Sequence, residues 1–333
     1  MMQDFSVIRE LREAEETSSW IKSVIAVMPD TGSPVIISRL NKEKLIKHYS
    51  YAPNAEKLSA SEQKAILERA ELKFVQEAKD FIEINKKVIG LSHSNIVGVL
   101  HVDKDQTTGE DIIVREFFSG ISLYDMTEGM AVEGMIPLFL GLIDAVDFIH
   151  RHKFLHLNLK PKKVRISESI NGYTIKLADF GYAADKKSNP ETIHGVLAFG
   201  APEVLLRDKD KFGEGSDIFS IGAIMYYCMT RAWPFPQREG AKDFGRLIEI
   251  LKNEHMPMKP SAANPAILDT AFTAGIRYKK DIKKISQFED AVMDIISERK
   301  IQTAGELHRV IMDIFPDITT GQVISSATIT SGI

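Results

Sequence analysis

Side chains that can do chemistry gather between residues 156 and 203. His156, Asn158 and Lys163 lie in one loop, Asp179 begins an Asp-Phe-Gly turn, and an Ala-Pro-Glu turn follows at 201–203. A carboxylate such as Asp179 can bind a divalent cation, and a carboxamide can orient a hydroxyl, although it has no basic oxygen to take up the proton. Lys163 would repel a metal ion. We therefore expect Lys163 to form an ion pair with Asp179, in which the protein supplies the positive charge that a metal would otherwise supply.

Composition excludes several classes of protein. The chain has 333 residues, which predicts one large bilobal unit or two domains, and 44% of them are hydrophobic. Its 42 Lys and Arg against 46 Asp and Glu give a net charge of -4. The basic residues form no block, so nucleic acid and anionic membranes are not predicted as partners. The single cysteine, Cys228, excludes a disulfide framework within one chain. Since no apolar segment or signal peptide suggests a membrane, we expect a soluble, cytoplasmic protein.

The elements that position the loop begin with strands. Apolar runs bounded by turn residues predict strands at 5–13, at 20–28 and from 34 onward, and a strand pair at 96–102 and 112–117. An Asp-Gln-Thr-Thr-Gly turn would connect the last two strands.

Helices dominate the rest of the chain. Ser59-x-x-Glu62 is a capping box, and the helix that it starts can run to about Val88 without a Gly or Pro. Residues 216–230 are apolar on nearly all faces, which predicts a helix buried in the core. The polar residues from 316 onward indicate a tail or linker. Further helices are predicted at 136–152, 241–253, 266–276, 286–297 and 303–315.

Six ordered pieces of sequence connect this pattern to a known family. Besides the loop and the two turns above, they are His-Ser-Asn-Ile-Val at 93–97, Glu-Phe-Phe-Ser-Gly at 116–120 and Asp-Ile-Phe-Ser-Ile-Gly at 217–222. In this order they resemble the motifs of eukaryotic-like (Hanks-type) serine/threonine protein kinases, over roughly residues 5–300.

The resemblance implies an α+β, bilobal kinase-like fold. Residues 1–118 would form an N-lobe with an antiparallel sheet and a long helix C, and an insert and this helix would occupy about 44–90. Residues 119–315 would form a mainly helical C-lobe, and residues 316–333 a polar tail or linker.

The positions that would bind nucleotide depart from the family pattern. Ala14, Glu16 and Ser19 stand where the resemblance implies the three glycines of a loop that closes over phosphates. Ser38 replaces the lysine that would bridge the phosphates and helix C, and Ile36 would fill the space of the adenine. We therefore expect a degenerate nucleotide pocket and no cofactor, with ATP and magnesium admitted only under an alternative function.

The catalytic and metal positions depart as well. The resemblance places the catalytic aspartate at Asn158 and a metal-binding asparagine at Lys163. No catalytic residue and no metal site are therefore expected, and Asp179 is the one surviving metal ligand.

Two arginines line the expected nucleotide slot. Arg115 falls at the gatekeeper position, and Arg165 falls where a leucine would support the adenine. Unpaired guanidiniums in an apolar slot are costly. Either the two arginines reach Glu16, Asp179 or solvent, or the slot has collapsed, and Arg165 could equally extend outward.

The glutamate of helix C can be placed in two registers. The local motif selects Glu77, whereas counting back from His93 gives Ile84, next to Glu83. Seven residues are about two helical turns, so Glu77 and Ile84 can share one face.

Other family positions are retained, and they are residues that hold the fold together. The resemblance implies that an apolar stack joins the lobes and that Asp217 anchors the backbone of the catalytic loop. Glu203 lacks a clear arginine partner. The stack would consist of His156, Phe180, Val99 and Val88, and the lysines that could replace the arginine are Lys283, Lys284 and Lys300.

These departures favour a pseudokinase over an enzyme. We expect a kinase fold of the serine/threonine class that binds a protein partner, as a scaffold or an allosteric regulator in signalling, with little or no ATP binding. Two alternatives remain open. One is a sensor that binds a small ligand or anion between the lobes, and the other is an atypical kinase that still uses ATP.

Overall fold

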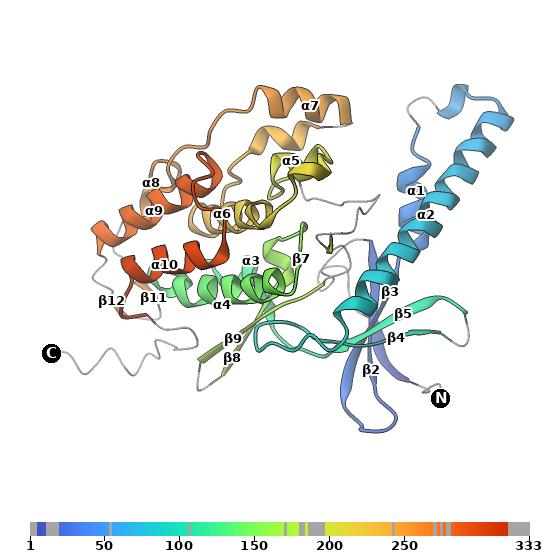
Figure 1. The fold of residues 1–333 in the computed structure, drawn as a ribbon, viewed down its shortest axis with the longest axis horizontal. Coiled ribbons are helices and arrows are strands. Elements are labelled where there is room, and N and C mark those ends of the chain that lie inside the picture. The colour runs from blue at the N-terminus through green and yellow to red at the C-terminus, as the bar shows by residue number, and fades with distance from the viewer. Residues whose placement is uncertain are drawn as a thin grey trace.

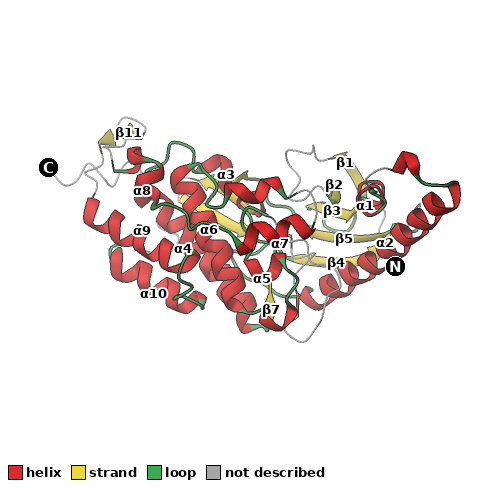
Figure 2. Ribbon diagram, turned by 90° about the horizontal axis from the view of Figure 1, so that it is seen from above, coloured by secondary structure: helices red, strands yellow, loops and turns green. Residues whose placement is uncertain are grey.

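The structure is a computed structural model in which two lobes lie side by side, one built on a sheet and the other helical (Figures 1 and 2). This architecture agrees with the bilobal α+β fold expected from the sequence. The structure describes residues 5–10, 20–52, 55–105, 108–169, 172–179, 184–185, 197–241, 244–268, 272–273, 276–277 and 281–318.

Five strands form the antiparallel sheet of the N-lobe, in the order β1-β2-β3-β5-β4. The central strand β3 pairs Ser38 with Ser23 and Ile36 with Arg115, so these four side chains meet in one region. β4 begins later than predicted, because Ile96 forms a bridge with Leu177 of the other lobe. The strands are β1 (Ser6–Glu10), β2 (Ile21–Val27), β3 (Pro34–Leu40), β4 (Val99–Lys104) and β5 (Asp111–Glu116).

Two helices accompany the sheet, and the longer one extends well beyond it (Figure 1). Helix α2 (Ala60–Val88) has 29 residues and begins with the predicted capping box, in which the Ser59 amide donates to Glu62 at 2.8 Å. Helix α1 (Lys42–Tyr49) was not predicted from the sequence. It starts after Asn41, whose side chain accepts from the Lys44 amide, and it packs against α2. A 3₁₀ turn (Ala55–Lys57) lies between the two helices.

The second lobe is mainly helical and is built around helix α6, which is buried at every residue from Ser216 to Thr230, as predicted. Its helices are α3 (Leu123–Met126), α4 (Val132–Arg151), α5 (Pro202–Leu205), α6 (Glu214–Thr230), α7 (Phe244–Lys252), α8 (Pro260–Ala263), α9 (Ile282–Ile296) and α10 (Ala304–Ile314). Short 3₁₀ turns lie at Pro161–Lys163, Lys209–Lys211, Pro236–Gly240 and Pro265–Ile267.

The helix predicted at 266–276 was wrong. A 3₁₀ turn ends at Ile267, and the later residues contain the short paired strands β11 (Phe272–Thr273) and β12 (Ile276–Arg277). Phe272 and Ile276 therefore lie on two paired strands, where aromatic and β-branched residues are favoured.

Short strands position the loop that carries Asn158 and Lys163. The strands β6 (Ile121–Ser122), β8 (Val164–Ser169) and β9 (Gly172–Leu177) form one sheet, and β7 (Phe154–Leu155) pairs with β10 (Ala184–Asp185). One hydrophobic core runs through both lobes and includes Phe81, Ile113, Ile143 and Phe219. In the described part of the chain, no helix is both long and apolar enough to cross a membrane.

Candidate functional site

The turn that carries Lys163 lies against the segment that follows strand β9. The Ala178 amide donates to the Lys163 carbonyl at 2.8 Å. Asp179 comes next and has a φ of 68°, a left-handed conformation that costs a non-glycine residue roughly 1–3 kcal/mol. The strained backbone is held by this packing, and it leaves the Asp179 carboxylate beside the side chain of Lys163.

Two cations from different lobes hold the buried Asp179 carboxylate. Lys163 Nζ lies 3.1 Å from Asp179 Oδ2, and Arg115 Nη2 of strand β5 lies 3.5 Å from Oδ1. Asp179 is 1% exposed, Lys163 0% and Arg115 5%. The ion pair predicted between Lys163 and Asp179 is confirmed. Of the alternatives for Arg115, the structure shows the one in which it reaches Asp179.

The charges of this cluster follow from its burial and its pairing. Burial alone would raise the pKa of Asp179, but Lys163 and Arg115 outweigh it and hold that pKa well below its usual range. Burial lowers the pKa of Lys163, and Asp179 acts in the opposite direction. The carboxylate is therefore ionised at neutral pH, and the stability that it contributes is lost as the pH falls below the range of a free aspartate.

Asn158 lies in the same loop and is 4% exposed. Its backbone amide donates to His156 Nδ1 at 3.3 Å. Its buried side-chain oxygen Oδ1 accepts no hydrogen bond within the described residues. Lys160, two residues further on, was not singled out in the sequence. Burial, and then the charge of Lys163, lower the pKa of Lys160 to about 8.

Asp217 anchors the loop backbone, as the resemblance implied. Its carboxylate accepts hydrogen bonds from the amides of His156 and Leu157, both at 2.7 Å, and lies 2.9 Å from Nε2 of His150. Burial opposes the charge, but the contacts with His150 and His156 lower the pKa of Asp217. Leu157 has a φ of 55°, so the anchor also holds a left-handed turn in place.

Strand β3 presents a hydroxyl where the resemblance implied a lysine. Ser38 is 0% exposed, and its Oγ lies 3.0 Å from Oγ of Ser23. Arg39 points to the other side of the sheet, as expected from strand alternation, and pairs with Glu110 at 3.3 Å. The cation closest to Ser38 in sequence therefore takes no part in the site.

Helix α2 buries both candidate positions for its glutamate. Glu77 is 1% exposed and Ile84 7%, so the two share one face as predicted, whereas Glu83 is exposed. The hydroxyl of Tyr49 in α1 donates to Glu77 Oε2. Burial and then Glu77 raise the pKa of Tyr49, so the phenol stays protonated and acts as the donor. Because the contact depends on a helix that was not predicted, the sequence did not reveal it.

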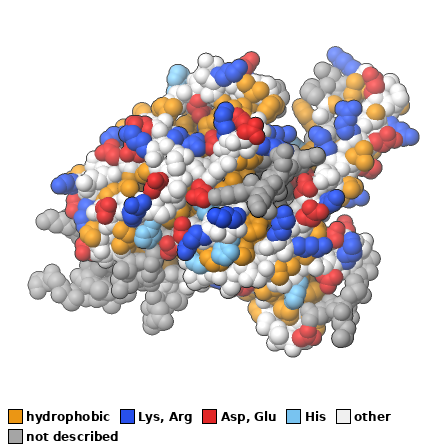
Figure 3. Space-filling view, viewed as in Figure 1, with side chains coloured by type: hydrophobic (Ala, Val, Ile, Leu, Met, Phe, Trp, Pro, Cys, Tyr) orange, Lys and Arg blue, Asp and Glu red, His pale blue; other side chains and the backbone are white. Residues whose placement is uncertain are grey.

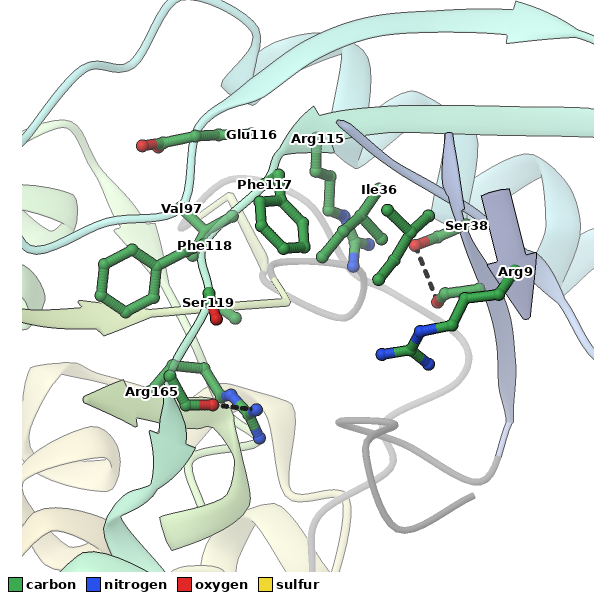
Figure 4. Close-up of a pocket in the computed structure, with 14 residues that line it drawn as sticks. Arg9, Ile36, Ser38, Val97, Arg115, Glu116, Phe117, Phe118, Ser119 and Arg165 are labelled. Carbon is green, nitrogen blue, oxygen red and sulfur yellow. Dashed lines mark hydrogen bonds between the residues drawn. The ribbon is translucent and has the colours of Figure 1, made fainter. Parts of the chain in front are cut away.

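A cavity of about 160 Å³ lies between the lobes, next to the segment that connects them (Figure 4). Ile36, Val97 and Phe117 line it, together with Arg115 and Arg165. Pockets for small molecules are usually about 300–1,000 Å³, so this one is small for a nucleotide.

The connecting segment is fixed by polar contacts. Arg165 Nη2 donates to the carbonyl of Gly120, a neutral partner that was not among those expected. Glu116 receives bonds from Lys176 at 2.8 and 2.9 Å, and from the Gly98 amide at 3.2 Å. Lys176 was not singled out from the sequence, because its role depends on the pairing of the two lobes.

The partner expected for Glu203 was wrong. Arg299 donates to both carboxylate oxygens of Glu203, at 2.8 and 3.2 Å, and Ser216 donates at 2.7 Å. Arg299 reaches Glu203 from a left-handed turn with a φ of 56°, just after helix α9. Two of the lysines proposed from the sequence pair with other carboxylates: Lys284 lies 3.7 Å from Asp317, and Lys300 lies 3.2 Å from Asp294.

Several predictions fall on residues outside the described part of the chain. They concern the loop that stands in place of the glycine-rich loop and the residues after Asp179, namely Ala14, Glu16, Ser19, Phe180 and Gly181. Among the described members of the predicted stack, His156, Val99 and Val88 are all buried.

The comparisons with known proteins agree with this geometry. The family profile described as "Protein kinase domain" matches residues 54–304, which is more than half of the chain. The chain belongs to the protein kinase family. A crystal structure of the PknI kinase domain of Mycobacterium tuberculosis superposes with a TM-score of 0.61 at 14% identity, covering 94% of this chain and 97% of that one. At this identity the likeness shows the fold alone.

Relatives in the kinase family include bacterial and animal proteins. The chain is 27% identical over 227 residues to a probable serine/threonine-protein kinase PknB of Lactococcus lactis, covering 65% of this chain and 34% of that protein. It is 32% identical over 156 residues to the human serine/threonine-protein kinase ULK1, covering 44% of this chain and 14% of that protein. The chain thus spans about a third or less of the length of these kinases.

Proposed function

We propose that this protein kinase-like chain is a pseudokinase, which transfers no phosphoryl group, binds little or no ATP, and acts as a protein-binding scaffold or allosteric regulator. The observation that carries the proposal is the buried cluster in which Lys163 and Arg115 hold the carboxylate of Asp179. A kinase needs the corresponding aspartate to hold magnesium. Here the side chains of Lys163 and Arg115 already hold it.

Magnesium does not fit the residues at this site. The ion prefers octahedral oxygen ligands, and the ammonium of Lys163, 3.1 Å from the carboxylate, would lie against it and repel it. Within the described residues, no group of three His, Cys, Asp or Glu side chains is arranged to hold a metal. We therefore derive no catalytic step that uses a metal.

The other catalytic requirements are also unmet. Asn158 has no basic oxygen for the proton of a substrate hydroxyl, and a well-placed general base contributes about 10²–10⁴-fold to a rate. Ser38 offers a hydroxyl, bonded to Ser23, at the position that would hold the phosphates with a cation. These changes affect separate parts of the reaction, namely proton transfer and phosphate binding.

A nucleotide titration, together with an assay of phosphate transfer, tests the proposal. We expect no change in Tm when ATP or ADP is added with Mg²⁺ or Mn²⁺, because Lys163 and Arg115 already neutralise Asp179. A ligand at a hundred times its Kd would stabilise the fold by about 2.7 kcal/mol, an effect that is easily measured. A metal-dependent rise in Tm, together with transfer of labelled phosphate to a protein substrate, would contradict the proposal.

The projecting part of helix α2 is the surface that we propose for the protein partner. Leu67, Leu72 and Val75 are 46%, 71% and 63% exposed there. Basic and acidic side chains lie near one another on this end of the molecule (Figure 3). Such an apolar surface rimmed by charges is typical of protein-binding sites.

Substitutions on this helix test the proposed surface. Leu72→Glu with Val75→Glu is expected to lower partner capture at least tenfold, with no change in Tm, because both side chains are exposed. Glu71→Gln, on the same exposed stretch, is the control and should leave capture unchanged. Equal capture by the wild-type chain, the double variant and Glu71→Gln would exclude this surface as the docking site.

A further inference from the structure

The exposed face of helix α2 carries four residues in a regular line. Glu68, Leu72, Val75 and Lys79 follow one another at intervals of four, three and four residues. An alternation of three and four is the spacing of a coiled-coil seam, so these side chains lie in one line along the helix. All four residues are exposed, and Leu72 and Val75 are 71% and 63% exposed. We call this line the α2 stripe.

The α2 stripe lies on the side of the helix that points away from the N-lobe. Successive residues of a helix turn by about 100°, so Ala70, Glu77 and Phe81 lie about half a turn from the stripe. These three residues are buried, and α1 packs against α2. Figure 1 shows that α2 extends beyond the sheet. A partner helix can therefore reach the stripe from solvent.

The charges of the α2 stripe are arranged evenly about its apolar middle. Glu68 lies four residues before Leu72, and Lys79 lies four residues after Val75. Lys64 Nζ lies 3.8 Å from the carboxylate of Glu68, but the two side chains are 77% and 63% exposed, so this pair is weak. A carboxylate has two acceptor oxygens, and Glu68 can bind a second cation beside Lys64. One end of the stripe is therefore acidic and the other basic.

This arrangement is complementary to itself when two copies run in opposite directions. In an antiparallel pair with a two-fold axis at the midpoint, Glu68 of each chain faces Lys79 of the other, and Leu72 faces Val75. In a parallel pair, Glu68 would face Glu68 and Lys79 would face Lys79, and like charges repel. The charges therefore favour the antiparallel pair, in which two-fold symmetry makes each contact occur twice.

We propose that the partner of helix α2 is a second copy of this chain, bound as an antiparallel two-fold dimer through the α2 stripe. The inference rests on the docking surface proposed above and identifies its partner. Each chain contributes two apolar residues to the contact, so the dimer is expected to dissociate on dilution. Its charge pairs lie near solvent, so the dimer is also expected to weaken in high salt.

Sedimentation velocity of the full chain over a range of concentrations tests the dimer. At low ionic strength we expect the sedimentation coefficient to rise from that of the monomer toward that of the dimer as the concentration increases. High salt should shift it back, because salt screens exposed charge pairs. A chain that sediments as a monomer at every concentration, or a dimer that salt does not weaken, would overturn the inference.

Charge reversal tests the pairing and its direction. Glu68→Lys and Lys79→Glu should each weaken the dimer at least about tenfold, because each turns two attractive pairs into two repulsive ones. The two variants mixed in equal amounts should form a mixed dimer, in which every facing pair again has opposite charges. The double variant, with both reversals in one chain, should regain the affinity of the wild-type chain. Single variants that dimerise as well as the wild type, or a mixture that stays monomeric, would contradict the antiparallel pairing.

A reversal on the other lobe is the matched control. Arg309→Glu makes the same change in net charge as Lys79→Glu, at an exposed position on α10. It should leave the dimer unchanged. Equal weakening by Arg309→Glu would mean that net charge and not the stripe governs association, and the inference would fail. Because Glu68, Lys79 and Arg309 are all exposed, no variant is expected to lower Tm.

Different results decide the dimer and the proposed function. If the chain stays monomeric while Leu72→Glu with Val75→Glu still lowers capture of another protein, the second copy is excluded and the docking surface on α2 remains. If the chain dimerises through the stripe but also transfers phosphate in the presence of metal, the dimer stands and the proposed pseudokinase function fails.

Discussion

Replacing Lys163 by methionine is expected to lower the free energy of unfolding by about 3–5 kcal/mol. Methionine keeps much of the volume of the lysine side chain but removes the ammonium that lies 3.1 Å from the carboxylate of Asp179, while Arg115 stays at 3.5 Å. Both partners of the lost pair are fully buried, so water cannot replace the missing charge. The midpoint of urea denaturation, with its slope, measures the loss.

The adjacent lysine provides a matched control. Lys162 lies in the same turn but is exposed, so Lys162→Met should change the stability by less than about 0.5 kcal/mol. If Lys163→Met is as stable as Lys162→Met, the ion pair between Lys163 and Asp179 does not stabilise the fold. The proposal that this pair stands in place of a metal ion would then lose its support.

The ion pair between Lys163 and Asp179 could be predicted because both residues lie in recognisable sequence motifs. The resemblance implied that the positions of Asp179 and Lys163 share one metal site, and here they carry a carboxylate and a lysine, whose opposite charges pair when buried. Arg115 could be named for the same reason, since its strand position was set by the neighbouring motif. Its choice between Asp179 and other partners depended on three-dimensional distances, and only the structure decided it.

Fold elements were predictable where local chemistry and tertiary packing favour the same structure. The capping box at Ser59 and the all-apolar stretch 216–230 are of this kind. Helix α1 was missed because its residues are polar and its packing against α2 stabilises it. The helix predicted at 266–276 was wrong, because Phe272 and Thr273 pair with Arg277 and Ile276 in two short strands.

Long-range contacts of the site could not be derived from sequence. Arg299 meets Glu203 from a left-handed turn, and Tyr49 meets Glu77 from an unpredicted helix. Arg9 lies in a strand predicted correctly, but nothing in its neighbourhood indicated that it would reach the cavity opposite Arg165. Each contact joins segments whose relative position is fixed by the packing of the whole chain.

The second large effect expected is a loss of stability in mild acid, caused by His156. This imidazole is 0% exposed, and burial, then the charge of Lys163, lower its pKa to about 4. In the unfolded chain its pKa is about 6.5, so between these values the unfolded state binds more protons and stability falls as the pH is lowered. The full effect is about 3 kcal/mol, of which roughly 2 kcal/mol appears between pH 7 and pH 5.

Urea midpoints measured at pH 7, 6 and 5 should therefore decrease in the wild-type chain and change less in His156→Phe, which cannot be protonated. The effect of Asp179 can be separated from that of His156 by its pH range. The lowered pKa of Asp179 means that its contribution to stability is lost mainly below the titration range of a free aspartate. His101→Phe, at an exposed position on β4, is the control and should keep the wild-type slope. A His156→Phe protein with an unchanged slope would mean that another group carries the acid sensitivity. A flatter slope would instead show that burial, beside the charge of Lys163, keeps His156 neutral in the folded chain.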